Sequence, residues 1–156
     1  MIRGKPAALL SLSAYLGALA ATEDPQRAAI FAEFALSLGV SFQIHDDILG
    51  IWGDPKVTGK SAASDILARK KSLPVLYGLA RSDALRRRYA DPIEFSEMMV
   101  QDIVAELEHT GALTYARSLE QEWNKRALDA LDRSEPTAVG AAKLRALVDA
   151  LFERQS

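Results

Sequence analysis

Two neighbouring carboxylates, Asp46 and Asp47, interrupt a segment that is otherwise largely apolar. The segment, residues 36–52, reads LSLGVSFQIHDDILGIW. Its apolar side chains would cover most of a helix surface, which predicts a helix that runs through the protein interior. Burying ionised carboxylates is costly unless cations, hydrogen-bond donors or water compensate them. A divalent cation would compensate both acids at once, because Mg²⁺ and Ca²⁺ prefer oxygen ligands.

The helix alone leaves two interpretations of the acidic pair open. The acids form a metal or other functional site, or they pair with Arg or Lys from a neighbouring helix or at an exposed rim. His45 falls on the apolar stripe, so we interpret it as a hydrogen-bonded core or interface histidine. On a helical wheel the acids share one face with a glutamine and two glycines, namely Gly39, Gln43, Asp46, Asp47 and Gly50.

Basic residues follow the acidic pair and favour the first interpretation. Residues 53–59 (GDPKVTG) predict a loop that returns the chain alongside the acids. Asp65 and Arg69 have the i, i+4 spacing of a helical ion pair. Carboxylates and lysines at the mouth of a helical cleft suit a diphosphate, which bridges to Mg²⁺ and accepts from ammonium groups. Each lysine alone is commonly a surface charge, so the prediction depends on the set Lys56, Lys60, Lys70 and Lys71.

The elements that must position these residues are predicted to be helices throughout. Apolar residues recur at helical spacing, and no strict alternation reaches strand length. Asp24-Pro25 and Asp91-Pro92 each fit an N-cap followed by proline, and Pro74 is expected to kink or restart a helix. The chain should therefore be one all-α domain, residues 1–156. The expected helices cover about 5–21, 25–52, 62–80, 93–109, 112–133 and 137–153.

Residues 6–22 are uncharged and follow Arg3 and Lys5, a pattern that resembles a secretory signal. They are too short and too rich in Ala, Ser and Gly to predict a membrane span. A bundle helix is the alternative, since leucines and small residues occupy separate faces. The leucine face comprises Leu9, Leu12, Leu16 and Leu19, and the small-residue face Ala7, Ser11, Ala14, Ala18 and Ala21.

The composition excludes several classes of site. The chain has 156 residues and no Cys, which excludes disulfides, thiolate metal sites and a Cys nucleophile. Two His residues argue against a multi-His metal centre. The formal net charge of -2 gives no reason to expect nucleic-acid binding. A metal site would therefore use oxygen ligands and favour Mg²⁺, Ca²⁺ or Mn²⁺.

The motifs taken together resemble a known family. The run FQIHDDILGIWGDP at 42–55, then TGK at 58–60 and KKSLP at 70–74, resembles the second aspartate-rich region of trans-isoprenyl diphosphate synthases, the polyprenyl synthetase family. The likeness is greatest to the bacterial geranylgeranyl diphosphate synthase-like branch. It is strong over residues 1–80 and loose thereafter. It implies an antiparallel helical bundle of the isoprenoid synthase type, the C-terminal half of such an enzyme, in which 6–22 is an internal helix.

The resemblance also implies an activity and residue roles. The family transfers an allylic prenyl group to isopentenyl diphosphate with Mg²⁺, and a cytoplasmic location follows from it. Asp46 and Asp47 match the acids that hold Mg²⁺ on the allylic diphosphate. The matched diphosphate-binding residues are Lys5, Gln43, Lys60 and Lys70, and the expected catalytic residues are Asp46, Asp47 and Lys60.

The chain departs from the family pattern at several positions. Gly50 stands at the third acid of the usual DDxxD motif, Pro6 where Thr is usual and Arg69 where Gly is usual. The family's first aspartate-rich motif lies in an N-terminal half and has no counterpart in these 156 residues. We therefore expect a homo-oligomer or a second chain that supplies that motif. The alternatives are a non-catalytic partner subunit and a diphosphate-binding helical module without turnover.

Overall fold

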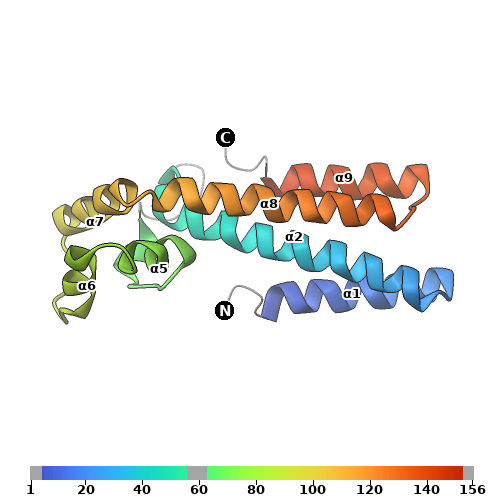
Figure 1. Ribbon diagram of the computed structural model, residues 1–156, viewed down its shortest axis with the longest axis horizontal. Coiled ribbons are helices and arrows are strands. Elements are labelled where there is room, and N and C mark those ends of the chain that lie inside the picture. Colours follow the sequence, from blue (N-terminus) through green and yellow to red (C-terminus); the bar gives the residue numbers. More distant parts are fainter. Residues whose placement is uncertain (1–4, 56–62, 153–156) are drawn as a thin grey trace. The chain divides into compact units, whose positions relative to one another are not determined.

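The computed structural model describes residues 5–55 and 63–152 (Figure 1). These residues form helices joined by turns and contain no β-strand, so the all-α prediction is confirmed. They divide into two compact units. The bundle unit comprises described residues up to 43 and from 119, and the acidic unit comprises 44–118. The helices are α1 (Lys5–Thr22), α2 (Pro25–Trp52), α4 (Ser64–Leu67), α5 (Leu73–Leu79), α6 (Asp83–Ala90), α7 (Glu97–His109), α8 (Ala112–Arg133) and α9 (Ala138–Phe152).

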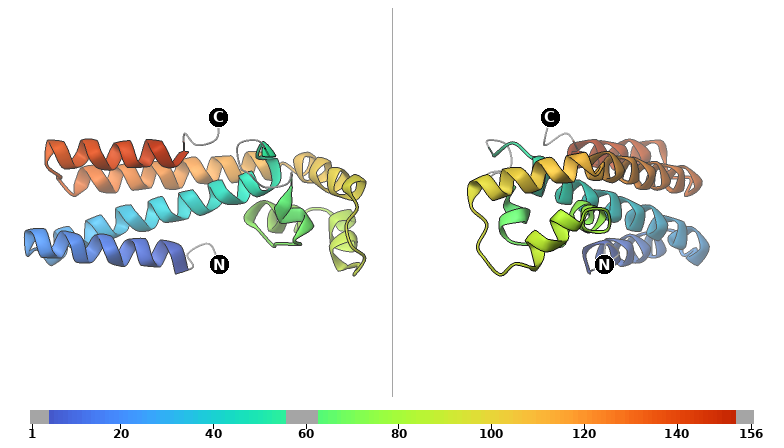
Figure 2. Two further views of the ribbon diagram at one scale, coloured as in Figure 1. Left: turned by 180° about the vertical axis from the view of Figure 1, so that it is seen from behind. Right: turned by 60° about the vertical axis from the view of Figure 1, so that its left-hand side comes forward.

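Long antiparallel helices build the bundle unit from α1, the first part of α2, the second part of α8, and α9 (Figures 1 and 2). Asp24 caps α2, as predicted, by accepting from the backbone N–H groups of Gln26 and Arg27 at 2.9 and 3.1 Å. Arg27 then donates to the main-chain oxygen of Ser134 at 2.9 Å and to that of Glu135. The turn before α2 is thereby tied to the turn before α9. A shared apolar core joins α2, α8 and α9 through Phe34, Leu38, Ala127, Leu131 and Val148.

The small-residue face of α1 packs inward and its leucines face outward. A Cβ atom on Gly39 would lie 2.8 Å from the Ala7 Cα, so α1 and α2 approach closely there. Ser11 donates to the Ala32 carbonyl at 3.0 Å. Of the leucines predicted to share a face, Leu9, Leu12 and Leu16 are 55–65% exposed and Leu19 is half-buried. From here on the leucine face means the exposed leucines of α1, which retain 45–65% of their accessible surface and are Leu9, Leu10, Leu12 and Leu16. Two distinct faces were expected on this helix. The small-residue face is the one packed against α2, because small side chains permit the closer approach of the two helices.

The helix α2 is 28 residues long and, of the described helices, is the one apolar enough to cross a membrane by length and composition. Half of its most apolar stretch is buried within the protein. The core helix of a soluble protein can be equally long and apolar, because its apolar side chains are buried against neighbouring helices.

The acidic unit is built from shorter helices around Ile66, Val75, Leu85, Ile103 and Leu107. The helix expected over 62–80, with a kink or restart at Pro74, is interrupted well before that proline, between Leu67 and Leu73. The chain instead forms α4, a turn and α5, because Arg69 adopts a left-handed backbone with φ 50°. The predicted restart at Pro74 is confirmed, since this proline lies in the first turn of α5.

Two further boundaries differ from the expected ones. The polar helix α6 was not predicted, and α7 begins at Glu97 rather than near residue 93. Asp91 does not cap a helix, since its carboxylate accepts from the Ile93 N–H at 3.2 Å in a turn. Ser96 caps α7 instead, by accepting from the Met99 N–H at 3.3 Å. The early start predicted from Asp91-Pro92 is therefore wrong.

Candidate functional site

Asp47 is the more deeply buried acid of the predicted pair. Its side chain is only 6% exposed. One carboxylate oxygen, Oδ1, accepts from the Lys70 ammonium at 3.0 Å. The other, Oδ2, accepts from the Leu73 backbone N–H at 3.0 Å. Leu73 is the first residue of α5, and its N–H has no partner within that helix. Both oxygens of Asp47 are therefore satisfied, which offsets the cost of burying this charge.

Asp46, its neighbour on α2, lies in a more open environment. Its side chain is 45% exposed, and its Oδ2 lies 3.9 Å from the Lys70 ammonium. At this distance the two charged groups form an ion pair, but they are too far apart for a hydrogen bond. One acid of the pair is thus anchored, and the other keeps a large part of its surface accessible to a ligand.

Lys70 lies among three carboxylates. Its ammonium donates to Asp65 Oδ2 at 2.7 Å and to Asp47 Oδ1 at 3.0 Å, with Asp46 at 3.9 Å. Partial burial lowers the pKa of Lys70, but the hydrogen bonds to Asp65 and Asp47 and the charges of both acids outweigh it. The net shift raises the pKa of Lys70 above its ordinary value of 10.5. Lys70 is therefore a fixed cation at neutral pH.

The turn that ends α4 brings Lys70 to this position. Its backbone N–H donates to the Asp65 carbonyl at 2.9 Å, which closes a tight turn around the left-handed Arg69. The Asp65–Arg69 ion pair expected from helical spacing is wrong because α4 ends at Leu67, before Arg69. Arg69 instead donates to the Tyr89 carbonyl at 3.2 Å, and its guanidinium lies 4.0 Å from the centre of the Phe95 ring. Burial raises the pKa of the neighbouring Tyr89 to about 12.

Sequence reasoning missed the contact between Asp65 and Gly50. A Cβ atom on Gly50 would lie 2.4 Å from the Asp65 Cγ, a distance that real side chains do not reach. The Asp65 carboxylate therefore lies directly over Gly50. The signal for this contact was the glycine itself, at a position where the family pattern has an acid.

The remaining predicted residues are only partly described. Gln43 lies on α2, four residues before Asp47, and is half-buried. His45 is half-buried on the same helix. Lys5 is the first residue of α1, but its side chain lies outside the described part. Lys56 and Lys60 also lie outside the described residues.

The acids fit a hard divalent cation by their chemistry. Within the described ranges, no group of three Asp, Glu or His side chains is arranged as a ready metal site. The three carboxylates converge on Lys70 instead, so its ammonium takes the position of a shared cation. Carboxylate oxygens are the ligands that Mg²⁺ and Ca²⁺ prefer. The ion pairs of Asp46 and Asp47 with Lys70 match the ion-pairing interpretation of the acidic pair.

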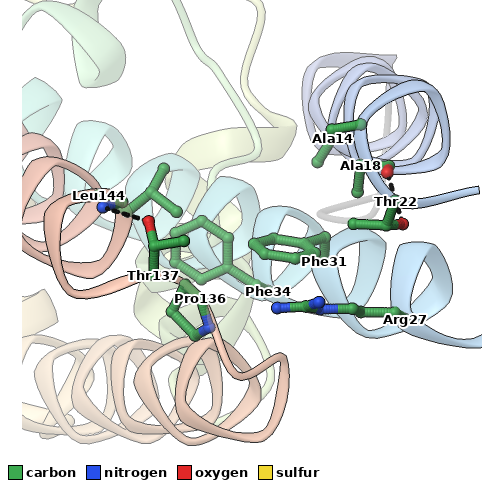
Figure 3. Close-up of a pocket in the computed structure, with 11 residues that line it drawn as sticks. Ala14, Ala18, Thr22, Arg27, Phe31, Phe34, Pro136, Thr137 and Leu144 are labelled. Carbon is green, nitrogen blue, oxygen red and sulfur yellow. Dashed lines mark hydrogen bonds between the residues drawn. The ribbon is translucent and has the colours of Figure 1, made fainter. Parts of the chain in front are cut away.

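An apolar pocket lies elsewhere, in the bundle unit, and contains none of these residues (Figure 3). It has a volume of about 360 Å³. Small residues of α1 face Phe31 and Phe34 of α2 there, with Thr137 and Leu144 on the α9 side. Asp and Glu are absent from its lining, so it is distinct from the acidic cluster around Lys70.

Comparison with known proteins supports the resemblance inferred from the motifs. Geranylfarnesyl diphosphate synthase from Aeropyrum pernix is 37% identical over 158 residues, which cover 99% of this chain and 49% of that protein. The polyprenyl synthetase structure from Streptomyces coelicolor A3(2) superposes with a TM-score of 0.83 at 32% identity, over 94% of this chain and 46% of that one.

A third relative was crystallised with ligands. Geranylgeranyl pyrophosphate synthase from Corynebacterium glutamicum, complexed with calcium and isoprenyl diphosphate, has a TM-score of 0.81 at 28% identity and is matched over 98% of this chain and 48% of that one. The chain thus spans about half the length of the relatives that it matches. Residues 1–108 match the sequence profile described as Polyprenyl synthetase. The chain therefore belongs to the polyprenyl synthetase family.

Proposed function

We propose that this chain supplies the second aspartate-rich region of a prenyltransferase that joins an allylic diphosphate to isopentenyl diphosphate. The observation that supports the proposal is the convergence of Asp46, Asp47 and Asp65 on the Lys70 ammonium, in the segment that resembles the family's second aspartate-rich region. The named activities of the relatives support the same reaction class.

In this proposal Asp46 and Asp47 hold Mg²⁺, which supplies charge neutralisation for the departing diphosphate. Lys70 leaves the carboxylates and donates to diphosphate oxygens, together with Lys5 and Lys60. Asp47 keeps its hydrogen bond from the Leu73 N–H, so its orientation is preserved when Lys70 moves. Gln43 lies one helical turn before Asp47 and contacts the same ligand.

The chemical step breaks the allylic C–O bond, and the bonding electrons go to the diphosphate. The double bond of isopentenyl diphosphate attacks the resulting allylic cation, and the product then loses a proton. The residues of this chain contribute electrostatic stabilisation of the leaving group.

The exposed leucine face of α1 supports the proposal that a second helical segment packs against this chain. Four large apolar side chains side by side mark an interaction surface, because monomeric proteins rarely leave such patches in water. We assign this face to a helical segment that carries the first aspartate-rich motif, on a second chain or in a longer polypeptide. A dimer and a cytoplasmic location are the corresponding family expectations.

Binding of Mg²⁺ with inorganic pyrophosphate, followed by calorimetry, tests the site directly. Asp46→Ala should lower the affinity about 10-fold or more, since a ligand oxygen is lost, and Asp47→Asn should do the same. Asp102→Ala is the matched control, because Asp102 is an exposed aspartate paired with Arg88. Unchanged binding in both site variants would refute the assignment.

Turnover separates the proposal from its alternatives. The purified chain is mixed with Mg²⁺, isopentenyl diphosphate and labelled farnesyl diphosphate, with and without a polypeptide carrying the first aspartate-rich motif. Product that requires the second polypeptide supports the proposed role. Pyrophosphate binding without product in any mixture would identify a binding module, and stimulation of an already complete synthase would identify a modulating partner.

A further inference from the structure

The turn that ends α4 has the hydrogen bonds of a Schellman motif. The Lys70 N–H donates to the Asp65 carbonyl and the Arg69 N–H donates to the Ile66 carbonyl, each at 2.9 Å. Arg69 occupies the left-handed position of this motif, with φ 50°. Glycine usually occupies that position, because a residue with a Cβ atom adopts the left-handed conformation only at a cost. Other contacts must therefore hold Arg69 in this conformation.

The guanidinium of Arg69 makes those contacts with the end of α6 and the segment that follows it. It donates to the Tyr89 carbonyl at 3.2 Å and to the Ile93 carbonyl, and it lies 4.0 Å from the centre of the Phe95 ring. The rings of Tyr89 and Phe95 meet edge to face with their centres 5.5 Å apart, and both pack against the core of the acidic unit. These contacts of the guanidinium, which we call the Arg69 anchor, therefore connect the turn to the core.

The turn determines where the side chain of Lys70 lies. A Schellman motif brings the residue after the turn against a residue in the last turn of the helix, and this contact is usually apolar. Here the two residues are Lys70 and Asp65, whose charged atoms lie 2.7 Å apart. The same ammonium donates to Asp47 Oδ1 at 3.0 Å. Both contacts thus depend on the conformation of Arg69.

We propose that Arg69 is a positioning residue, whose anchor on residues 89–95 holds the backbone of Lys70 beside Asp46 and Asp47. The inference rests on the proposed function, in which Lys70 donates to diphosphate oxygens. The anchor fixes only the backbone of Lys70, so its flexible side chain remains able to exchange a carboxylate oxygen for a diphosphate oxygen. Glycine, the usual residue of the family pattern, permits the same turn, whereas Arg69 also restrains it.

The competing explanation is that Arg69 only stabilises the connection between α6 and α7. Three variants separate the two explanations. Arg69→Ala removes the anchor and keeps the conformational cost of the left-handed position. Arg69→Gly removes the anchor and that cost together. Phe95→Leu weakens the anchor from its far side and leaves the sequence of the turn unchanged.

The first readout is the acetylation rate of Lys70 relative to that of Lys71, measured by mass spectrometry at constant pH without metal or pyrophosphate. Lys71 is exposed and serves as the internal reference. An ammonium held by carboxylates reacts slowly, so Arg69→Ala should raise this ratio about fivefold or more, as expected for the loss of one hydrogen bond. Arg69→Gly should raise it less, because glycine keeps the turn accessible. The second readout is calorimetric affinity for Mg²⁺ with inorganic pyrophosphate, which Arg69→Ala should lower about 10-fold.

Two comparisons isolate the anchor. Arg81→Ala removes an arginine outside the anchor that lies 3.4 Å from the centre of the Tyr77 ring, and it should leave both readouts unchanged. Phe95→Leu should raise the acetylation ratio in the parent but not in the Arg69→Gly background, where no anchor is left to weaken. Melting temperatures are recorded for every variant, and labelling is done well below them, so that unfolding does not raise the ratio.

Three results would overturn the inference. The first is an acetylation ratio in Arg69→Ala within about twofold of the parent, even with a lower melting temperature, since Arg69 would then only stabilise the fold. The second is an equal effect of Phe95→Leu in both backgrounds. The third is a pyrophosphate affinity of Arg69→Ala within about threefold of that of a parent that binds.

Asp47→Asn tests the proposed function separately. If this variant loses pyrophosphate binding while the acetylation ratio of Arg69→Ala is unchanged, the proposed function survives and only the inference fails. If Asp47→Asn binds as the parent does and the ratio of Arg69→Ala rises as expected, the proposed function fails, and the positioning of Lys70 by Arg69 stands.

Discussion

The two units depart in opposite ways from the usual pattern of buried apolar and exposed charged side chains. In the acidic unit Asp47 is buried, but Lys70 and the Leu73 N–H satisfy both of its oxygens. In the bundle unit the leucine face of α1 is exposed. A buried charge needs its partner within the folded chain, because its desolvation cost is large and immediate. An exposed apolar face does not prevent the chain from folding, but it makes the folded chain prone to associate with other apolar surfaces.

Replacing Lys70 should have the largest effect on the acidic unit. Lys70→Met leaves Asp47 and Asp65 without their cation, and we expect a loss of about 2 kcal/mol in the free energy of unfolding. Lys71→Met, at the exposed neighbouring lysine, should change it by less than about 0.5 kcal/mol. Urea unfolding followed by circular dichroism measures both variants. Equal effects would mean that the three carboxylates do not depend on Lys70.

A pair of glycines tests the close packing in the bundle unit. Gly39→Ala places a methyl group 2.8 Å from the Ala7 Cα, and we expect a loss of about 1–2 kcal/mol from this overpacking. Gly17→Ala meets no atom within 4 Å and should stabilise α1 by about 0.5–1 kcal/mol through its higher helix propensity. Thermal unfolding should therefore shift in opposite directions. A shift of the same sign in both variants would contradict the observed contact of α1 with α2.

Alkaline pH should weaken the acidic unit through Lys70. The pKa of this lysine is raised in the folded protein, so its stabilising contribution is complete below about pH 10.5, the unfolded value. It is lost as the pH rises through the higher folded pKa. The parent protein should lose stability above about pH 10.5 more steeply than Lys70→Met does. Parallel profiles in urea unfolding at pH 9 to 12 would refute this linkage.

The leucine face should affect stability least and association most. Leu12→Gln combined with Leu16→Gln replaces side chains that are each 55% exposed, so the free energy of unfolding should change by less than about 1 kcal/mol. Sedimentation should show less self-association, and binding of a hydrophobic dye should fall. Ala7→Gln, at a buried position of the same helix, should instead destabilise the bundle unit. Unchanged association in the leucine variant would show that the face is not an interaction surface.

Long periodic helices were predictable because local signals agree with packing. The bounds of α2 and α8 match the predicted ranges 25–52 and 112–133, and the Asp24 cap explains the sharp start of α2. The short polar helix α6 escaped prediction because little of it is buried. The break between α4 and α5 depends on the left-handed Arg69, whose guanidinium is held by contacts remote in sequence.

The candidate site was predictable only where one helix defines it. Asp46 and Asp47 were recognisable from two charges in an apolar segment. A diphosphate contact was expected of Lys70 from the family pattern alone. Its contacts with three acids depend on the turn after α4 and were not predictable. The position of Asp65 over Gly50 could not be read from local periodicity, because it depends on where two helices meet.

The hydrogen bond from the Leu73 N–H to Asp47 gives the acidic unit a natural spectroscopic probe. The amide proton of Leu73 senses the charge on the carboxylate that accepts it. If a metal ion binds Asp47, as proposed, it withdraws electron density from the carboxylate, so the Leu73 amide proton should become more shielded and its nitrogen resonance should shift. Labelling one leucine amide would then allow nuclear magnetic resonance to follow occupancy of the aspartates without any substrate turnover.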